Sequence, residues 1–286
     1  MVYLKDDKYV VVIDDIVLET HPTGIPKFHL SDQMCSGWWD SAGIKREKLS
    51  RASGWGDFRS EQFREARLIT WTGTAVASSA VELQAMRDEF TGLLHSKNET
   101  QLRVYSESTG NRYATVSLED APVWERLTDS AAIFQLKLYA PNPRIYGDLK
   151  EINLFIHDGY GGIQFPIEYD LDFNETTAEA TKFLVNGGNT NSYPTIEIQG
   201  EFPAGFKLTD GRGKWFTFSG TVTQASPVTI DSRTGRVTQK GISRSALVES
   251  TQNFVVGPLE QIQPRVEPIS PTSYGYAKFS LRDTFI

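Results

Sequence analysis

The sequence predicts a mainly β protein in which one α-helix accompanies the first domain and a second β domain follows. Three observations lead to this fold class. Most apolar segments are short and alternate with polar residues, which is the period of half-buried strands. Only one segment has apolar residues at helical spacing, and it follows a helix-capping motif. A junction that contains two prolines and a glycine divides the 286 residues near Gly147.

The first part opens with a predicted β-hairpin, in which Tyr9–Ile13 and Ile16–Glu19 flank the two-residue turn Asp14-Asp15. The clearest alternation lies in Ile133–Ala140, where apolar residues occupy the even positions before Ala140. Further strands are predicted at Ala66–Thr72, Gln101–Ser106 and Tyr113–Leu118.

The single predicted helix runs from about Ala80 to Ser96, or roughly four turns. Ser79 and Glu82 have the spacing of a capping box, in which each side chain satisfies an amide of the other residue. Apolar residues then recur at helical spacing: Leu83, Met86, Phe90, Leu93 and Leu94. Such a helix is expected to pack one apolar stripe on a sheet.

The segment Pro141–Gly147 predicts a domain boundary, because its prolines favour extended backbone and its glycine permits a turn. We therefore expect domains at residues 1–147 and 148–286. The second contains many short predicted strands between Gly-rich turns, which favours a β-sandwich. These strands are Glu151–Ile156, Gln164–Phe173, Lys182–Val185, Thr195–Gln199, Trp215–Phe218, Val228–Ile230 and Gly275–Phe279. The Pro-rich stretch Pro258–Pro271 is predicted to be a long loop that crosses a domain edge.

Composition excludes several classes of protein. The chain has 33 aromatic residues and 23% charged residues, enough to build a core and unlike a disordered chain. No apolar run approaches the roughly 18 residues of a membrane span. The net charge of -7 and the absence of a basic stripe argue against a reader of duplex DNA.

The cysteine count and the N-terminus indicate where the chain is made. Cys35 is the sole cysteine, which excludes an intrachain disulfide and a thiolate metal site. The first seven residues lack a basic region followed by an apolar stretch, so no secretory signal is predicted. We expect synthesis and folding in a cytoplasm.

Acidic residues and histidines give no persuasive site. Glu168, Asp170 and Asp172 lie on one face of a predicted strand and could bind a hard cation, but a solvated polar face is the preferred interpretation. Any pair among 36 acids could be drawn as a glycosidase pair, so that pattern carries no weight. The four histidines, with no metal-binding spacing among them, are His21, His29, His95 and His157.

The remaining motifs also favour structural roles. The Gly211-x-Gly213 pattern follows a strand without a helix behind it, which predicts a hairpin turn. Cys35 has no neighbouring histidine and is expected to be inert. Tryptophans could stack on sugars from an exposed loop or strand, although core or interface packing is preferred: Trp38, Trp39, Trp55 and Trp215. We predict no catalytic, cofactor-binding or metal-ligating residue and no cofactor.

The order of these features resembles the distal tail protein family of long-tailed, non-contractile bacteriophages. In the first half the resemblance rests on the opening strand pair, the Gly-rich stretch Ser53–Gly56, the capped helix, and the strands Leu102–Tyr105 and Arg112–Val116. Its most specific motif is Tyr139–Gly147, which is similar to an alanine, aspartate, proline, arginine, tyrosine, glycine junction, with Asn142 in place of aspartate.

In the second half the resemblance rests on Asn186–Ile196 and on the hairpin Val228–Arg236. The chain departs from the family at Val256–Gln261, where a leucine, proline, glycine and asparagine run is usual. That departure concerns the geometry of the last two strands.

The resemblance implies an N-terminal β-sandwich with one flanking helix, which forms a ring with its copies, and a C-terminal galectin-like β-sandwich on the periphery of that ring. It implies a structural virion protein and no enzyme. A hexameric hub of this kind joins the tail tube to the tail-tip or baseplate proteins of a siphovirus and lets DNA pass as cargo. Its location would be the phage tail tip, after synthesis in the host bacterial cytoplasm, with no membrane partner.

Two other interpretations stay open. One is a carbohydrate-binding tail-tip module that recognises host cell wall, and the other is a different tail-tube or tail-tip structural protein. A tail-associated wall hydrolase is the enzymatic alternative, and the lack of a credible acid–base pair counts against it.

Overall fold

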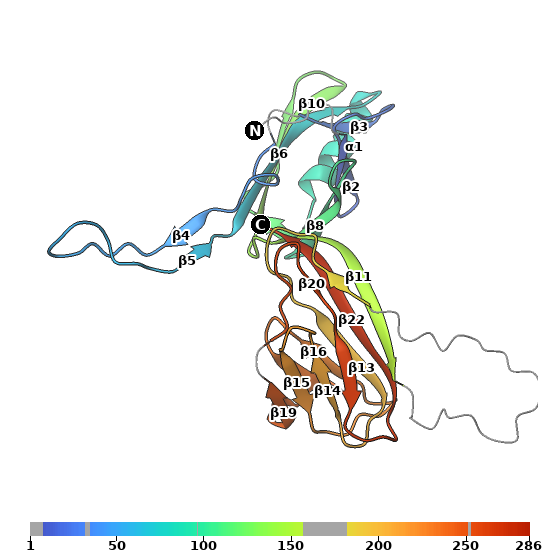
Figure 1. Ribbon diagram of the computed structural model, residues 1–286. Helices are drawn as coiled ribbons and strands as arrows, with labels where there is room; N and C mark the ends of the chain where they lie inside the picture. The colour runs from blue at the N-terminus through green and yellow to red at the C-terminus, as the bar shows by residue number, and fades with distance from the viewer. Residues whose placement is uncertain (1–7, 32–34, 96, 157–181, 251–252) are drawn as a thin grey trace, which may run out of the picture. The chain divides into compact units, whose positions relative to one another are not determined.

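A computed structural model describes residues 8–31, 35–95, 97–156, 182–250 and 253–286. The chain divides into two compact units, Met1–Gly147 with Ile286 (unit 1) and Asp148–Phe285 (unit 2). Both are mainly β, and the described residues contain one α-helix, in unit 1 (Figure 1).

Unit 1 contains α1 and the strands before the junction. Its elements are β1 (Tyr9–Ile13), β2 (Ile16–Glu19), β3 (Lys27–Leu30), β4 (Ile44–Arg46), β5 (Gln62–Arg64), β6 (Arg67–Val76), α1 (Ala80–Thr91), β7 (Thr100–Ser106), β8 (Gly110–Leu118), β9 (Val123–Arg126) and β10 (Ala131–Ala140), and the start of β11 (Ile145–Ile156).

Seven strands of unit 1 close into a barrel in the order β8-β7-β1-β2-β3-β6-β10. Closure comes from the pairing of β10 with β8, in which Leu138 lies opposite Leu118 and Tyr139 opposite Ser117. The predicted N-terminal β-sandwich is therefore corrected to a closed barrel. Strand periodicity could not reveal this closure, because a sandwich and a barrel bury every second residue alike.

The barrel interior is filled by the inward residues of alternating strands. The pattern along β10 buries each even position, which confirms the alternation predicted for this segment. Phe90 from α1 joins this core, with ring centroids 5.2 Å from Phe134 and 5.8 Å from Phe28. The helix thus buries one apolar stripe on the barrel, as its spacing predicts.

The helix is shorter than the predicted range of 80–96, because it ends at Thr91. Gly92 caps it, and Leu94 has a positive φ of 57°, so the chain turns away from the helix axis. Leu93 and Leu94 are nevertheless buried. The spacing of these two leucines fits a buried turn as well as a helix, which explains why the predicted helix was too long.

The predicted cap is present with one difference. The hydroxyl of Ser79 accepts a hydrogen bond from the Glu82 amide at 3.2 Å. The Glu82 carboxylate accepts from the amide of Ser78, at 2.6 Å, rather than from Ser79. The hydroxyl and the amide of Ser78 hold the pKa of Glu82 below its ordinary value.

The predicted hairpin between β1 and β2 is confirmed, with Asp14 in its turn at a φ of 48°. The Asp14 carboxylate accepts hydrogen bonds from Thr100 at 2.8 Å and from Lys97 at 3.0 Å. Burial raises the pKa of Asp14, but these two hydrogen bonds, the positive charge of Lys97 and a backbone hydrogen bond from Leu94 together outweigh it, so the pKa lies below its ordinary value. The turn is thereby tied to the segment that enters β7.

Arg67, at the start of β6, is buried and joins two distant parts of unit 1. Its Nη1 donates to the carbonyl oxygens of Gly37, at 2.7 Å, and of Asp40 and Trp38. Its Nε donates to the carbonyl of Pro143 at 3.1 Å. Burial lowers the pKa of Arg67, while the Asp40 carboxylate raises it. The guanidinium therefore fixes a loop before β4 against the junction that leads into β11.

Unit 2 contains the remainder of β11 and the strands that follow it. Its further elements are β12 (Leu184–Val185), β13 (Thr195–Glu201), β14 (Phe206–Thr209), β15 (Trp215–Phe218), β16 (Val228–Asp231), β17 (Arg236–Gln239), β18 (Ile242–Ser243), the short 3₁₀ helix η1 (Ser245–Leu247), β19 (Val248–Ser250), β20 (Gln261–Ile262), β21 (Arg265–Pro268) and β22 (Tyr274–Phe285).

Two sheets of unit 2 share one hydrophobic core, as expected for a β-sandwich. One has the order β18-β17-β16-β13-β22-β11 and the other the order β19-β15-β14-β21. Their buried residues meet in the core, among them Ile198 and Phe279 from the first sheet and Phe206 and Phe218 from the second. The predicted strand Gln164–Phe173 lies outside the described residues.

The prediction of a long loop over Pro258–Pro271 is wrong in part, because β20 and β21 lie within it. β21 pairs with β14 from Arg265 to Pro268. β21 is the last strand of its sheet. Pro268, which has no amide proton, is therefore tolerated there, because no second strand needs a hydrogen bond from it.

Asn186 is fully buried and organises the turn that leads into β13. Its Nδ2 donates to the carbonyls of Thr190 and Val256 at 2.7 and 3.0 Å, and its Oδ1 accepts from the amide of Gly188. A Cβ at Gly188 would lie 2.0 Å from the Thr284 carbonyl oxygen, so no larger residue fits there. The glycines of this motif thus permit close approach of two backbones.

We expect Arg67→Met to destabilise unit 1 by about 3 kcal/mol, because four carbonyl groups, all at least partly buried, lose a charged donor. The measurement is urea unfolding followed by tryptophan fluorescence, since five of the six tryptophans lie in residues 1–147. Arg103→Met is the control, because Arg103 is exposed and donates to the exposed side chain of Gln101; it should change stability by less than about 0.5 kcal/mol. Equal losses in both variants would contradict the role of Arg67.

We expect Asp14→Asn to destabilise unit 1 by about 1 kcal/mol at neutral pH, since asparagine tolerates the turn but loses the charge. A carboxylate with a lowered pKa stabilises the fold above its unfolded pKa, and this contribution is lost as pH falls through the folded pKa. The difference between the two proteins should therefore shrink below about pH 4. Urea unfolding from neutral to acidic pH measures the difference in free energy of unfolding. A difference that does not change with pH would contradict the stabilising role of the Asp14 carboxylate.

Candidate interaction surface

The described histidines that were singled out for chemistry bond to neighbouring residues of the fold or lie exposed. No group of three or more histidine, cysteine or acidic residues with metal-binding geometry occurs among the described residues. His21 bonds to Thr20, and His29 bonds to the Thr20 carbonyl at 2.8 Å. His95 is exposed. His157 lies outside the described residues, as do Glu168, Asp170, Asp172 and their predicted strand. Within the part of the chain that is described, no helix combines the length and apolar content needed to cross a bilayer.

Cys35 and the glycine pair adopt structural roles. The Cys35 thiol donates to the carbonyl of Ser31 at 3.2 Å. The Gly211-x-Gly213 pattern forms the predicted turn between β14 and β15, where the buried carboxylate of Asp210 accepts from the amides of Arg212 and Lys214. This aspartate closes the turn in the manner of an Asx motif.

The tryptophans of the Gly/Ser-rich stretch have different environments. Trp38 is buried, with its ring centroid 6.4 Å from that of Trp71, which confirms the preferred interpretation of core packing for this residue. Trp39 packs at 5.9 Å from the ring of Tyr9. Trp55, in contrast, is 97% exposed. Packing and exposure are thus both present within one short segment.

The segment that holds Trp55 is a two-stranded arm, residues 44–64, which extends from the barrel of unit 1 (Figure 1). β4 and β5 pair at its root, with Lys45 opposite Phe63. Gly54 and Gly56 have φ values of 111° and 81°, and they reverse the chain at the tip. The arm was missed in the sequence because β4 and β5 have only three residues each and all are exposed, so no alternation marks them.

Hydrogen bonds join the two sides of the arm at its root. The Glu65 amide donates to the Gly43 carbonyl at 2.9 Å. The Arg64 guanidinium donates to the hydroxyl of Ser41 and to the carbonyl of Ala42, both at 3.0 Å. Arg67 of β6 also donates to the carbonyls of Gly37 and Asp40, so hydrogen bonds connect the loop before the arm to the barrel.

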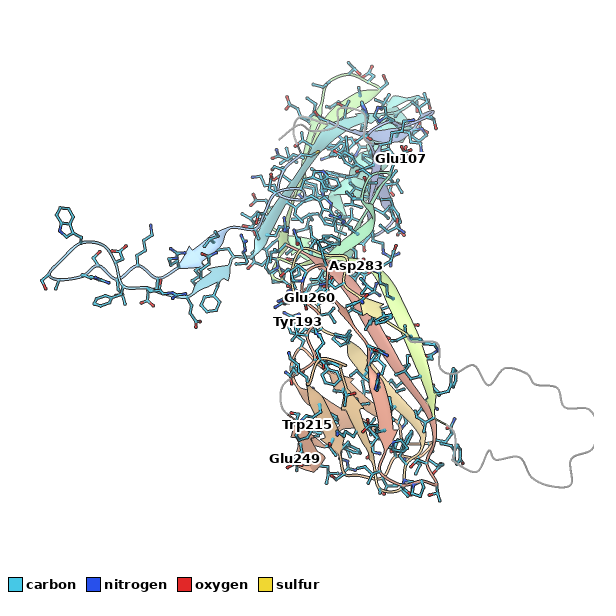
Figure 2. All side chains as sticks on the ribbon, in the orientation of Figure 1. Glu107, Tyr193, Trp215, Glu249, Glu260 and Asp283 are labelled. Atoms are coloured by element: carbon cyan, nitrogen blue, oxygen red, sulfur yellow. The ribbon has the colours of Figure 1, made fainter. Side chains whose placement is uncertain are left out.

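Large apolar side chains of the arm are exposed to solvent, and Figure 2 shows the arm's side chains standing away from the rest of the unit. Their exposed fractions are 52% for Ile44, 56% for Leu49, 97% for Trp55, 58% for Phe58 and 61% for Phe63. A cluster of exposed apolar residues on one element is typical of an interaction surface.

The arm is basic within an acidic chain. Residues 44–64 contain six basic and three acidic residues, a net charge of +3, while the whole chain carries -7. The remainder of the chain therefore carries -10. The arm is electrostatically suited to an acidic protein surface.

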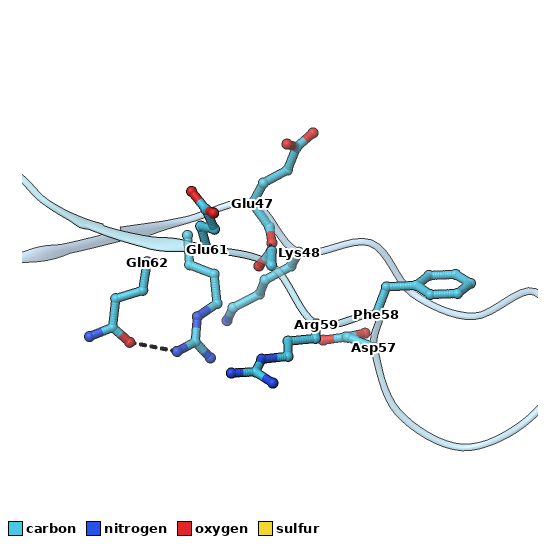
Figure 3. Close-up of a pocket in the computed structure, with 9 residues that line it drawn as sticks. Glu47, Lys48, Asp57, Phe58, Arg59, Glu61 and Gln62 are labelled. Atoms are coloured by element: carbon cyan, nitrogen blue, oxygen red, sulfur yellow. Dashed lines mark hydrogen bonds between the residues drawn. The ribbon is translucent and has the colours of Figure 1, made fainter. Parts of the chain in front are cut away.

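The two sides of the arm border an open groove of about 860 Å³ (Figure 3). Its lining carries basic residues, Arg46, Lys48 and Arg59, beside equal numbers of acidic ones, Glu47, Asp57 and Glu61. Arg46 donates to Gln62 across the groove at 2.6 Å. Because the charges are balanced and exposed, the groove gives no selectivity for a charged small molecule. The protein-facing role of the apolar residues is the stronger interpretation.

Unit 2 presents one further surface. Trp215 lies on the outward side of β15, between the buried Phe216 and the preceding turn, and is half-buried. Its neighbour across the sheet is Thr209, and Thr209 in turn lies opposite Arg265. Figure 2 shows Trp215 and Glu249 in the same part of the unit.

Comparisons with solved structures identify the fold. The chain is similar to the SPP1 Dit (gp 19.1) protein, described as a paradigm of the hub adsorption apparatus in phages that infect Gram-positive bacteria, with a TM-score of 0.62 and 12% identity over 97% of this chain and 99% of that one. The predicted resemblance to distal tail proteins is confirmed as a similarity of fold.

Two structures of the phage p2 baseplate in its activated conformation are more distantly similar. The structure with Sr has a TM-score of 0.48 and 13% identity over 96% of this chain and 97% of that one. The structure with Ca has a TM-score of 0.47 and 13% identity over 99% and 98%. No protein-family model and no curated protein matches the sequence.

Proposed function

We propose that this chain is a structural protein of a phage tail, a distal tail hub whose copies assemble into a ring that joins the tail tube to the tail-tip proteins. The observation that carries the proposal is the similarity of fold to the SPP1 Dit protein over 97% of the chain. The order of motifs from Tyr139–Gly147 to Val228–Arg236 supports it independently, since it rests on sequence alone.

The geometry of unit 1 fits self-assembly. A ring requires two different surfaces on each copy, because its interfaces are heterologous. The arm supplies a projecting surface, while the barrel removes most sheet edges that would otherwise pair without control. We assign ring formation to residues 1–147 and a galectin-like sandwich to residues 148–286.

The proposed partners follow from this role. They are further copies of the chain, six in all in one ring, the tail-tube protein and a tail-tip hub protein. Genomic DNA would pass through the ring as cargo without being held, which suits a chain of net charge -7. The protein would reside in the virion at the tail tip after synthesis in the host bacterial cytoplasm, with no enzymatic step.

We expect a hexamer of about 193 kDa, six times the 32.1 kDa chain, in light scattering coupled to size exclusion, and rings with a central hole in negative stain. Trp215→Ala should keep this mass, since it changes unit 2 alone. A protein that stays at 32.1 kDa at the highest attainable concentration would contradict self-assembly and favour a free-standing binding module.

A second candidate function is recognition of host cell-wall carbohydrate by unit 2. The outward Trp215, beside Thr209 and near the charged Arg265, gives an aromatic face with polar neighbours, which suits sugar stacking. We expect Trp215→Ala to weaken binding to cell-wall glycans on an array about tenfold, the effect of losing about 1.4 kcal/mol. Tyr274→Ala, which removes a 51% exposed aromatic side chain from β22 in the other sheet of unit 2, is the control and should bind normally. Equal binding by all three proteins would exclude this site.

A further inference from the structure

The barrel of unit 1 has an exposed apolar face on β9, β10 and the end of β6. Val123 is 52% exposed, Ile133 38% and Val76 36%. The register places Ile133 opposite Glu125 of β9, and Ala131 opposite Val76 of β6. Side chains of these strands alternate, so Val76, Val123 and Ile133 lie on the outer side, and we call them the acceptor face.

The acceptor face lies beside a strand edge. Among the described residues β9 pairs with β10 alone and is the last strand in its order, so its other edge has no neighbouring strand. An edge with exposed apolar residues is a ready site for another protein segment. Leu127, which follows β9, adds a further side chain that is 53% exposed.

The surroundings of the acceptor face are acidic. The segment 119–129 contains Glu119, Asp120, Glu125 and Asp129, whereas its one basic residue is Arg126. Arg126 pairs with Asp129 at 2.5 Å, and Lys137 of β10 pairs with Asp120 at 3.0 Å. The exposed carboxylates of Glu119 and Glu125 therefore add negative charge that these two ion pairs do not balance.

The arm has the complementary properties but does not reach this face in its own chain. Beyond the root, hydrogen bonds join the two sides of the arm to each other, such as Ser50 to Asp57 at 2.9 Å and the Phe58 amide to the Leu49 carbonyl at 2.8 Å. It carries +3 and several exposed apolar side chains. The arm and the acceptor face therefore have opposite charge, and both expose apolar side chains, although they do not contact each other within one chain.

We propose that the arm of one copy lies on the acceptor face of the next copy. Apolar residues of the arm, Leu49 and Phe58, pack on Val123 and Ile133, and its basic residues face the acidic segment 119–129. The proposal rests on the self-assembly of the proposed function and names its contact. Because the two surfaces differ, the contact is heterologous and repeats from copy to copy until the ring closes.

Disulfide trapping tests the contact directly in the full-length chain. In a Cys35→Ser background, Leu49→Cys is combined in turn with Val76→Cys, Val123→Cys or Ile133→Cys. The control combines Leu49→Cys with Val17→Cys, since Val17 is 41% exposed on β2, elsewhere on the barrel. We expect at least one acceptor pair to give an oxidised ladder of up to six chains, with a yield about tenfold above the control, because a disulfide needs close Cα atoms.

The outcomes separate this proposal from the proposed function. Rings of about 193 kDa with a ladder from an acceptor pair support both. Rings without a ladder from any of the three acceptor pairs overturn the assigned contact and leave the hub intact. Single chains without a ladder overturn both. Apart from the half-buried Cys35, the changed side chains are exposed, so an unchanged urea unfolding curve confirms that the variants fold.

Charge reversal gives a second, independent measurement. Lys48→Glu with Arg59→Glu on the arm should abolish the ring mass, and so should Glu119→Lys with Glu125→Lys on the acceptor side. Combining all four changes should restore it, because the charges again complement each other. The charge reversal Glu107→Lys, at an exposed residue that follows β7, is the control and should keep the ring. Assembly unaffected by the arm reversal or by the acceptor reversal would contradict the proposal.

Discussion

The buried guanidinium of Arg67 is the contact on which the organisation of unit 1 depends. It donates to carbonyl groups in the loop before the arm and to Pro143 in the junction, which lie far apart in the sequence. A buried cation satisfied only by backbone carbonyls tolerates no displacement of either partner. The root of the arm and the start of β11 are therefore positioned by the same side chain.

The consequence is an arm that is fixed at its base and exposed along its length. The exposed side chains of Trp55 and its apolar neighbours lower the solubility of a single chain. Because they are not buried, they do not stabilise unit 1. Such a surface is useful where another protein covers it. This is why the arm, rather than any cluster of ionisable groups, is the candidate site, and why the proposed function is structural.

Sequence patterns predicted the elements whose burial alternates. The hairpin around Asp14, the strand Ile133–Ala140 and the position of α1 follow from residues that face one core, and the structure contains all three. Predictions failed where a residue's environment comes from distant parts of the chain. Leu93 and Leu94 extended the predicted helix although they are buried in a turn, and the arm had no alternation to reveal it.

The sequence by itself determined a mainly β chain with one capped helix, its turns at Asp14 and Gly211, and the resemblance to distal tail proteins. These depend on local propensity and on the spacing of neighbouring residues. The tertiary structure alone decided that β10 closes on β8 into a barrel, that Trp38 is buried while Trp55 is exposed, and that Arg67 reaches Pro143. The physical reason is that strand pairing and burial are set by contacts between residues far apart in the sequence, which no local pattern encodes.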